Sequence, residues 1–379
     1  MNIAFYAPMK PPDAAIPSGE RLIARLFLQA LAKAGHQVEL ASRLRSFDKH
    51  GSARRQQRLA GLGQKLAGRL LRRWLGQPPA SRPRLWFTYH LYHKAPDWIG
   101  PIVADALGIP YVVAEASFAP KQQGGKWAAG HDAVAAALAR ADLVLSLNDD
   151  DRACLLPCVQ SPERVQSFPP FLDAAPYQAA RQARESLRAR LAARHGLNQS
   201  APWLLAAAMM REGDKLASYL LLAASLSRLQ SRDWQLLIAG DGPAAPEIRR
   251  AFAPLGRRVI SLGQCDADEM AGLYAAADLL VWPAIREAIG MSLLEAQSAG
   301  LPVVAGRSGA VPQIIADGET GLVAAYGDEA DFARRTEALL ADPERRIRMG
   351  QAAMGRVQQH HDLPAAARRL GAALERLNP

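Results

Sequence analysis

Short apolar runs alternate with amphipathic helical stretches along most of the chain, and this alternation restricts the possible folds more than any other feature. Near-continuously apolar strands separated by helices predict a parallel sheet that is covered on both faces. The first series of predicted strands comprises Ile3–Ala7, Gln37–Ala41, Leu85–Tyr89, Tyr111–Ala114 and Leu143–Leu147. The second series comprises Trp203–Met209, Trp234–Ala239, Val259–Leu262, Leu279–Trp282, Val303–Ala305 and Leu322–Ala324. Two such series predict an α/β protein with two doubly wound parallel sheets.

The length of the chain agrees with two domains. It has 379 residues, and a domain typically takes about 100–200 residues. We expect the boundary within residues 169–202, because this stretch opens with Pro169 and Pro170 and continues through polar, Arg-rich sequence. The expected domains are residues 1–168 and 169–360. Ligands of such sheets bind beyond the carboxyl ends of the strands, so a cleft between the domains is the first candidate for a site.

The composition excludes several classes of protein. Hydrophobic residues make up 49% of the chain and charged residues 22%, which argues against a disordered or fibrous protein. No apolar run approaches the ~18 residues of a membrane-spanning helix. The N-terminus reads as a strand and not as a secretion signal, so we expect a cytoplasmic location. The three cysteines, Cys154, Cys158 and Cys265, form neither a disulfide framework nor a zinc-binding pattern.

Positive charge is concentrated in residues 43–84, which hold twelve Lys and Arg and one acid, Asp48. An apolar stripe at helical spacing runs through this segment and predicts a basic amphipathic helix. The stripe consists of Leu59, Leu62, Leu66, Leu70 and Trp74. Two interpretations stay open: the helix covers the N-terminal sheet with a solvated outer face, or it docks on an anionic membrane that supplies a lipid-linked acceptor. A nucleic-acid partner is not expected, because no binding motif accompanies the charge.

The strongest chemical signal is the run REAIGMSLLEAQSAGLPVVA at residues 286–305, which follows the predicted strand Leu279–Trp282. Glu287 falls in the loop at the end of that strand. A helix follows, and its first-turn amides have no internal partners and suit an anion such as a diphosphate. These amides belong to Gly290, Met291 and Ser292. Glu295 lies more than a turn further on, and its two oxygens can accept both hydroxyls of a ribose. The alternative is that Glu287 is a solvated loop acid and Glu295 a structural cap or ion-pair partner.

This run resembles the E-x7-E signature of family 4 of the retaining glycosyltransferases (glycosyl transferases group 1), which reads E-G-F-G-x-x-x-L-E-A-x-A-x-G-x-P-V-V. The resemblance is good from about residue 200 onward and looser before residue 170. It implies the GT-B fold, in which two Rossmann-like domains face each other across a cleft. It also implies that residues 1–168 bind the acceptor, that residues 169–360 bind the donor, and that a helix within residues 361–379 crosses back onto the N-terminal domain.

By the same resemblance, Glu295 would hold the ribose of a nucleotide-sugar donor and Glu287 its sugar. Arg211 and Lys215 would hold the diphosphate, at a spacing of four residues where the family usually has five. Lys215 is the only lysine in residues 127–379, which contain 26 arginines. A compact ammonium on a flexible stem suits a phosphate that moves during a reaction.

Glycines mark two further places that the resemblance assigns to the donor site. Gly240 and Gly242 correspond to a G-x-G-P turn that lines the nucleotide cleft. The same run is similar to a dinucleotide fingerprint, but the next predicted strand ends without the required acid, so NAD is not expected. Gly19 corresponds to a glycine-rich turn near the donor phosphates, although a plain turn glycine would look the same.

The chain departs from the family on the acceptor side. Family members often carry a histidine after the strand that corresponds to Tyr111–Ala114, whereas this chain has Glu115. Glu115 and His90 are therefore candidates for contact with the sugar or the acceptor. The acidic run Asp149–Asp151 is interpreted as a capped helix start and not as a metal site.

The resemblance implies a retaining transfer that needs neither a metal ion nor a cofactor. The donor would be a UDP- or GDP-linked sugar, and the acceptor a glycan or a lipid-linked molecule in cell-surface polysaccharide or glycolipid synthesis. Two alternatives stay open: a sugar-nucleotide binding protein without turnover, and a GT-B epimerase that changes the sugar without transferring it.

Overall fold

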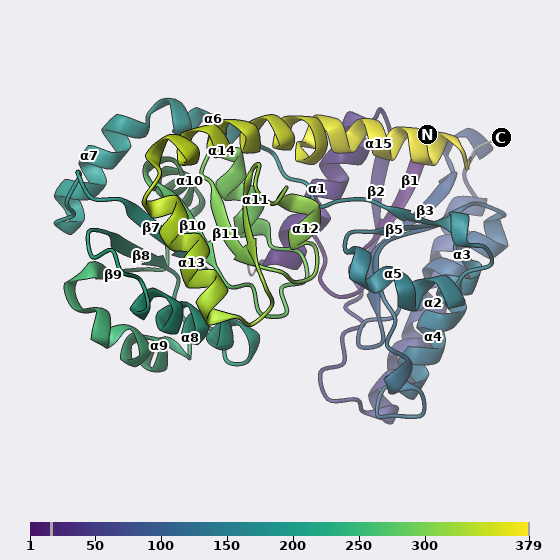
Figure 1. The fold of residues 1–379 in the computed structure, drawn as a ribbon. Helices are drawn as coiled ribbons and strands as arrows, with labels where there is room; N and C mark the ends of the chain where they lie inside the picture. The colour runs from purple at the N-terminus through teal and green to yellow at the C-terminus, as the bar shows by residue number, and fades with distance from the viewer. Residues whose placement is uncertain (16–17, 378–379) are drawn as a thin grey trace. The chain divides into compact units, whose positions relative to one another are not determined.

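The computed structural model describes residues 1–15 and 18–377, and the chain divides into two compact units (Figure 1). The first unit comprises residues 1–169 together with the chain from Leu363 onward, and the second comprises Pro170–Asp362. Each unit holds one six-stranded sheet. All neighbouring strands of both sheets pair in parallel. The two parallel sheets predicted from the alternation are therefore confirmed.

The sheet of the first unit has the strand order β2-β1-β3-β4-β5-β6. Its strands are β1 (Asn2–Tyr6), β2 (Gln37–Ser42), β3 (Leu85–Tyr92), β4 (Tyr111–Ser117), β5 (Leu143–Ser146) and β6 (Val165–Ser167). Its helices are α1 (Gly19–Lys33), α2 (Ala53–Leu75), α3 (Gly100–Leu107), α4 (Ala128–Arg140), α5 (Asp149–Leu155) and α15 (Leu363–Glu375). Helix α15 packs against α1. Strand β6 escaped the sequence analysis because its three residues are too few to show a period.

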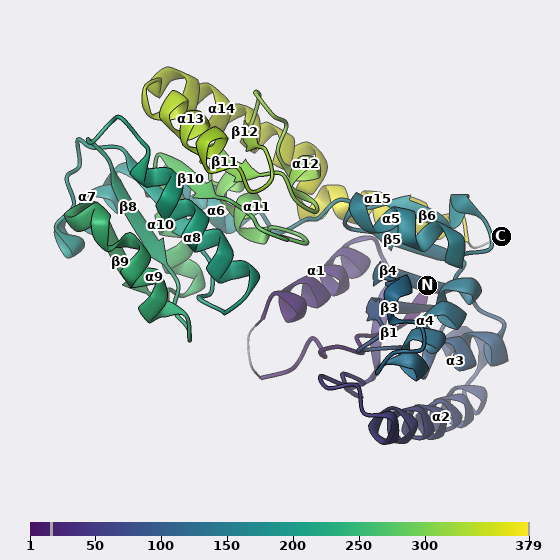
Figure 2. The same ribbon diagram turned by 60° about the horizontal axis from the view of Figure 1, so that its bottom comes forward.

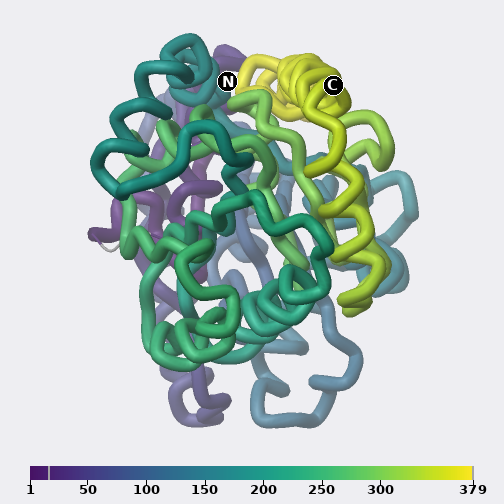
Figure 3. Tube along the Cα trace, turned by 60° about the vertical axis from the view of Figure 1, so that its left-hand side comes forward, coloured from purple at the N-terminus to yellow at the C-terminus, as the bar shows by residue number. Residues whose placement is uncertain are grey.

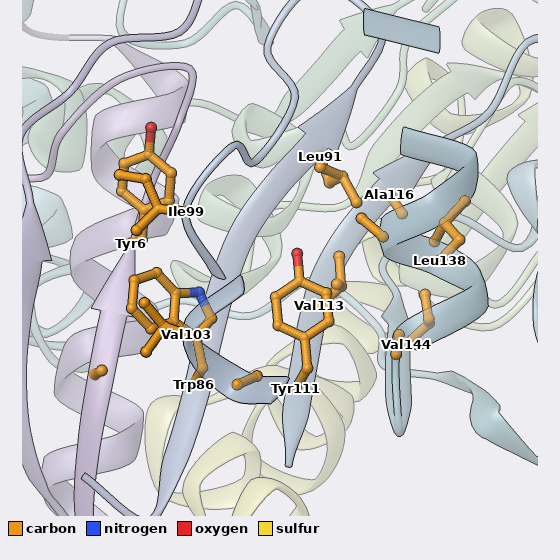
Figure 4. Close-up of a cluster of buried hydrophobic side chains, with 14 of the residues drawn as sticks. Tyr6, Trp86, Leu91, Ile99, Val103, Tyr111, Val113, Ala116, Leu138 and Val144 are labelled. Carbon is orange, nitrogen blue, oxygen red and sulfur yellow. The ribbon is translucent and has the colours of Figure 1, made fainter. Parts of the chain in front are cut away.

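Large aromatic side chains build the core of this unit (Figure 4). Trp86 and Tyr111 stand on the paired strands β3 and β4 and are fully buried. Trp74, from α2, meets Trp86 edge-on with the ring centroids 6.4 Å apart. Ile99 and Val103 fill the space beside them. Helix α2 is thus part of the core packing.

Helix α2 confirms the predicted basic amphipathic helix, and it packs on α3 and α4 (Figure 2). Leu59, Leu70 and Trp74 are buried as expected, but Leu62 is 41% exposed. The helix approaches the core through Gly63 instead, where a Cβ atom would lie 2.4 Å from Cβ of Trp98. The buried residues of the stripe therefore pack within the first unit and are not available to a membrane. The arginines of the outer face that are exposed include Arg54, Arg58, Arg69 and Arg72.

The sheet of the second unit has the strand order β12-β11-β10-β7-β8-β9. Its strands are β7 (Trp203–Ala207), β8 (Gln235–Ala239), β9 (Val259–Gly263), β10 (Leu279–Trp282), β11 (Val303–Gly306) and β12 (Gly321–Ala324). Its helices are α6 (Ala175–Gln182), α7 (Arg184–His195), α8 (Asp214–Ser227), α9 (Ala245–Phe252), α10 (Ala267–Ala276), α11 (Met291–Ser298), α12 (Val311–Ile314), α13 (Glu329–Leu340) and α14 (Pro343–Arg356). The yellow-green helices α13 and α14 follow the last strand (Figure 3).

The stretch 169–202 does not form a linker. Only its first residues lie at the division between the units, which falls between Pro169 and Pro170. Helices α6 and α7 occupy most of the rest and pack against α10. Arg188 of α7 stacks over the Trp203 ring and pairs with Asp278 at 2.9 Å. Arginine in the stretch 169–202 therefore contributes to packing within the second unit.

None of the helices described in residues 1–15 and 18–377 is long and apolar enough to cross a membrane.

Candidate active site

The strand order of the second unit explains where its candidate site lies. From β7 the chain proceeds to β8 on one side of the sheet, and from β10 it proceeds to β11 on the other. The loops at the carboxyl ends of the adjacent strands β7 and β10 therefore diverge and leave a crevice, which is the usual ligand position in such sheets. Lys215 stands in the first turn of α8, after β7. Glu287 lies in the loop after β10.

Lys215 and Glu287 are brought into direct contact at this crevice. The Lys215 ammonium pairs with Oε2 of Glu287. The indole Nε1–H of Trp282 donates to the same oxygen at 3.0 Å. The backbone N–H of Glu287 donates to the Ser308 hydroxyl at 3.0 Å. Glu287 is thus a tightly held carboxylate, and the alternative of a solvated loop acid is wrong, since its side chain is only 15% exposed.

Glu295 lines a neighbouring pocket of about 360 Å³. The Tyr274 hydroxyl donates to Oε2 of Glu295 at 2.8 Å, and Tyr177 also hydrogen-bonds to this carboxyl group. Burial raises the pKa of Glu295 to about 7, although both tyrosines favour its ionised form. Ser292 and Gly240 line the same pocket. An ionised Glu295 at the pocket wall can accept two hydroxyl groups of a ligand.

Two glycines allow the loops after β7 and β8 to approach each other closely. A Cβ atom at Gly240 would lie 2.0 Å from the carbonyl oxygen of Ala208, and one at Gly242 would lie 2.4 Å from that of Met210. Both glycines also have a positive φ, of 148° and 151°. Any larger residue would push the β7 loop away from the pocket.

The N-terminus of α11 offers unpaired backbone donors, as the sequence predicts. Gly290 takes the left-handed conformation, with φ 79°, and starts the helix. Its carbonyl accepts the N–H groups of Leu293 and Leu294. The N–H groups of Met291 and Ser292 have no hydrogen-bond partner in the described part of the chain. They carry the positive end of the helix dipole and suit an anion.

Arg211 is not in contact with the other predicted site residues. Its side chain is exposed, and Nη2 lies 3.2 Å from the Met209 sulfur. Met209 itself lines the Glu295 pocket. The left-handed Gly213 (φ 80°) ends the Arg211 loop and starts α8. Arg211 is therefore placed one short loop from Lys215, and no carboxylate of the described residues pairs with it.

A second cluster forms at the corresponding crevice of the first unit, where the strand order reverses between β1 and β3. His90 Nδ1 lies 2.5 Å from Oε2 of Glu20 and 3.5 Å from Oε1 of Glu115. Glu20 stands in the first turn of α1. His90 and Glu115 both adopt left-handed conformations, with φ 62° and 58°. Such strain in non-glycine residues is concentrated at functional sites.

Charge within this cluster is nearly balanced. Burial alone would lower the pKa of His90, but the charges of Glu115 and Glu20 outweigh it and raise that pKa to about 9. Burial raises the pKa of Glu115 to about 7, with His90 opposing. One ligand atom from each of the three residues lies within 4.8 Å of the others, a spacing that a metal ion can span. A protonated His90 has no lone pair to offer at Nδ1, which favours an internal ion pair.

The raised pKa of His90 predicts how stability depends on pH. A histidine with a folded pKa near 9 contributes stability that is complete below about 6.5 and lost as the pH rises to 9. Glu115 titrates at lower pH, near 7. We expect the wild type to lose about 2 kcal/mol of unfolding free energy between pH 7 and 9 through His90. His90 also lowers the pKa of Glu115, so the substitution is made in a Glu115→Gln background, where that acid cannot take over the titration. There His90→Asn, which tolerates the left-handed backbone, should remove the alkaline loss in urea denaturation.

The matched control is His93→Asn, because burial lowers the pKa of His93 and it is neutral throughout this range. Equal pH dependence of Glu115→Gln with and without His90→Asn would contradict the assignment of a charged His90.

The remaining predicted positions are less informative. Gly19 is the first residue of α1, and the hydroxyl of Ser18 caps this helix by accepting the Arg21 N–H at 3.2 Å. An anion-binding turn and a plain helix start would share this geometry. The capped helix start at Asp149–Asp151 is confirmed, with Asn148 accepting the N–H of Asp150 at 3.0 Å.

Sequence reasoning missed the uncharged residues that hold the acids. Trp282 and Tyr274 lie within buried apolar elements, β10 and α10, and look like ordinary core residues. Tyr177 falls in the stretch that was interpreted as a boundary. Glu20 was recognisable only as a neighbour of Gly19. No periodicity or spacing marks these side chains as partners of a distant acid.

The chain is similar to known proteins in sequence and in fold. Residues 201–342 match the family described as Glycosyl transferases group 1. The D-inositol 3-phosphate glycosyltransferase of Corynebacterium efficiens is 41% identical over 139 residues, which is 35% of this chain and 33% of that protein. The α-D-kanosaminyltransferase of Streptomyces kanamyceticus is 32% identical over 255 residues, which is 66% of this chain and 62% of that protein. The chain thus spans less than two thirds of the length of either relative.

A solved structure covers nearly the whole chain. The Anabaena protein HepE, in complex with UDP and glucose, superposes with a TM-score of 0.71 over 99% of this chain and 100% of that one. The sequence identity is 16%, so the likeness concerns the fold. The predicted GT-B class, with two Rossmann-like parallel sheets, is confirmed by this likeness and by the strand orders.

Proposed function

We propose that this chain, whose residues 201–342 match the family described as Glycosyl transferases group 1, moves a sugar from a nucleotide-sugar donor to a glycan or lipid-linked acceptor. The observation that carries this proposal is the meeting of Lys215 and Glu287 at the crevice between β7 and β10, beside the pocket of Glu295. A cation, an anion-binding helix end and two partly buried acids there match the three parts of such a donor: diphosphate, sugar and ribose.

The proposed roles follow from the chemistry of each group. Glu295 accepts the ribose hydroxyls, and Glu287 accepts hydroxyls of the sugar. Lys215 and Arg211, with the free amides of Met291 and Ser292, neutralise the charge that grows on the leaving diphosphate. These fixed donors act where other enzymes use a divalent cation, so the proposed reaction needs no metal ion. The configuration at the sugar carbon is retained, as in family 4.

The first unit is proposed to bind the acceptor. His90 and Glu115 stand at the carboxyl ends of β3 and β4, where sheets of this kind present their ligands. Glu115 Oε2 is buried and has no hydrogen-bond partner among residues 1–15 and 18–377, so a hydroxyl of a bound ligand can satisfy it.

A panel of nucleotide sugars tests the function, with UDP-glucose first because HepE was solved with UDP and glucose. We expect one donor to raise the melting temperature and to be hydrolysed slowly without acceptor. NMR of the released sugar reports the anomer.

Treatment with EDTA should leave the rate within about twofold. Abolition by EDTA with rescue by Mg²⁺ would overturn the metal-free mechanism. Binding without hydrolysis or transfer would favour a binding protein, and a changed sugar an epimerase.

Peripheral attachment to an anionic membrane is proposed for the basic face of α2. Each exposed cation near such a surface contributes on the order of 1 kcal/mol. We expect vesicles with anionic lipid to bind the wild type at low salt and to release it at high salt. A quadruple Arg→Gln variant should lose this binding and keep donor hydrolysis; it changes Arg54, Arg58, Arg69 and Arg72, all exposed.

The variant spares Arg55 and Arg73, which bond to Phe47 and Glu39 within the unit. Its control removes the same charge from the second unit, at Arg232, Arg249, Arg250 and Arg348. A wild type that ignores anionic vesicles at low salt would show that the basic face is only solvated.

A further inference from the structure

Trp282 touches two of the charged residues of the candidate donor site, Lys215 and Glu287. It is the last residue of β10, and only 1% of it is exposed. Its indole N–H donates to Oε2 of Glu287 at 3.0 Å. The Lys215 ammonium, which pairs with that same oxygen, lies 5.3 Å from the centroid of the Trp282 ring, within cation–π range. One buried side chain therefore contacts the cation and the carboxylate together.

Helix α8 holds the indole in place. Residues three and four apart on a helix share a face. Here Lys215 and Ser218 contact the loop that carries Glu287, and Tyr219 contacts Trp282 itself. The Ser218 hydroxyl accepts the N–H of Ile285 at 3.0 Å. The Tyr219 ring meets the Trp282 ring edge-on at 5.0 Å. The Tyr219 hydroxyl in turn donates to the carbonyl of Ala208 at 2.7 Å. The packing of Tyr219 against the indole therefore fixes the ring and the direction of its N–H bond.

Donor binding would weaken the contact between Lys215 and Glu287, and the indole N–H of Trp282 can compensate for this loss. Lys215 must turn toward the diphosphate and so gives up much of its contact with Glu287. A carboxylate that loses its cation also loses a contact that held it in place, and it can then move. The indole N–H is a buried donor without a charge, so the diphosphate does not attract it away from Glu287 as it attracts the ammonium. It can keep Oε2 of Glu287 in place and leave Oε1 for a hydroxyl of the sugar.

We propose that Trp282 is a positioning residue: its N–H fixes the Glu287 carboxylate while Lys215 moves between that carboxylate and the donor diphosphate. The ring face keeps the ammonium within reach after the ion pair opens. This inference rests on the proposed function for the roles of Lys215 and Glu287, but the contact itself can be tested without a donor.

The first test is NMR of the tryptophan indole N–H signals in the whole protein. Trp282→Phe assigns the signal. We expect it to be strongly protected from solvent exchange in the wild type and in Lys215→Ala, and to exchange at least tenfold faster in Glu287→Ala. The Trp234 indole donates to the Ser231 carbonyl at 3.0 Å and should not respond. Loss of protection in Lys215→Ala, or unchanged protection in Glu287→Ala, would overturn the proposal.

The second test is kinetic. Trp282→Phe should lower kcat by about 10- to 100-fold while KM for the donor changes less than about threefold, because a ring remains for Lys215 but the N–H is lost. Trp234→Phe is a matched control: Trp234 is also 1% exposed, bonds a carbonyl through its N–H and lies under a cation, Arg258. It should keep the wild-type kcat.

In the Glu287→Ala background, Trp282→Phe should cost less than about twofold, since the residue through which it acts is gone. An equal loss with and without Glu287 would mean that Trp282 serves only the fold, and normal kcat in Trp282→Phe would overturn the inference. Absence of turnover with every donor in the wild type would overturn the proposed function instead, and the exchange measurement would then decide the contact alone.

Discussion

Lys215→Ala should lower kcat by about 10²–10³, the scale for removing one preorganised group that stabilises the transition state. Negative charge grows on the leaving diphosphate as the sugar departs, so the ammonium matters more in the transition state than in the bound donor. KM should therefore change much less than kcat. The measurement is the steady-state rate of donor hydrolysis or transfer, with melting temperature as the check on folding.

Two further variants sharpen this test. Arg211→Ala should behave similarly, and the double variant should lose less than the product of the two effects, because both cations serve one diphosphate. Arg228→Ala is the control: Arg228 directly follows α8 and forms an exposed pair with Glu329 at 3.3 Å. Normal turnover in Lys215→Ala would show that the donor diphosphate does not lie at this crevice.

Glu295→Gln should make the protein more stable at alkaline pH and abolish high-affinity donor binding. The folded protein holds the pKa of Glu295 near 7, above its ordinary value. Below about pH 4.5 the carboxyl is neutral in both folded and unfolded chains, and it adds no cost. As the pH rises to about 7, the unfolded chain ionises more readily, so the wild type loses stability. Glutamine avoids this loss, and its carbonyl still accepts the tyrosine hydroxyls.

We expect Glu295→Gln to exceed the wild type by about 1–3 kcal/mol of unfolding free energy at pH 8, and by much less at pH 4.5. Urea denaturation at the two pH values measures this difference. Glu344→Gln, an exposed acid, is the control and should show neither effect. A variant that is destabilised equally at both pH values would mean that Glu295 is a structural ion-pair partner. Retained donor affinity would remove it from the ribose site.

A Glu295→Gln variant that is more stable at pH 8 and no longer binds the donor tightly would mean that the fold tolerates a destabilising acid because the ligand needs it. Both Glu295 and Glu115 have pKa values raised to about 7 by burial, and each stands at the carboxyl end of a sheet, one in each unit. Perturbed carboxyls in this position are candidates for function. The stability that they remove is small compared with the burial of two complete sheets.

The sequence by itself determined the two parallel sheets and the charged residues of the candidate site. Alternating apolar strands and helices leave few topologies, and the run from Glu287 to Glu295 carries its own chemistry, since a glycine, a helix start and two acids lie within nine residues. Helix α2 was likewise readable from its spacing. These features are local, so they survive in a one-dimensional pattern.

Only the tertiary structure decided which side chains meet. The reversal of strand order between β7 and β10 brings Lys215 to Glu287 across 72 residues, and the reversal between β1 and β3 brings Glu20 to His90 across 70. The tyrosines on Glu295 and the indole on Glu287 come from elements whose sequence serves the core. Leu62 turns outward because Gly63 lets α2 approach Trp98. Strand order and close approach depend on contacts distant in the chain, and no local pattern encodes them.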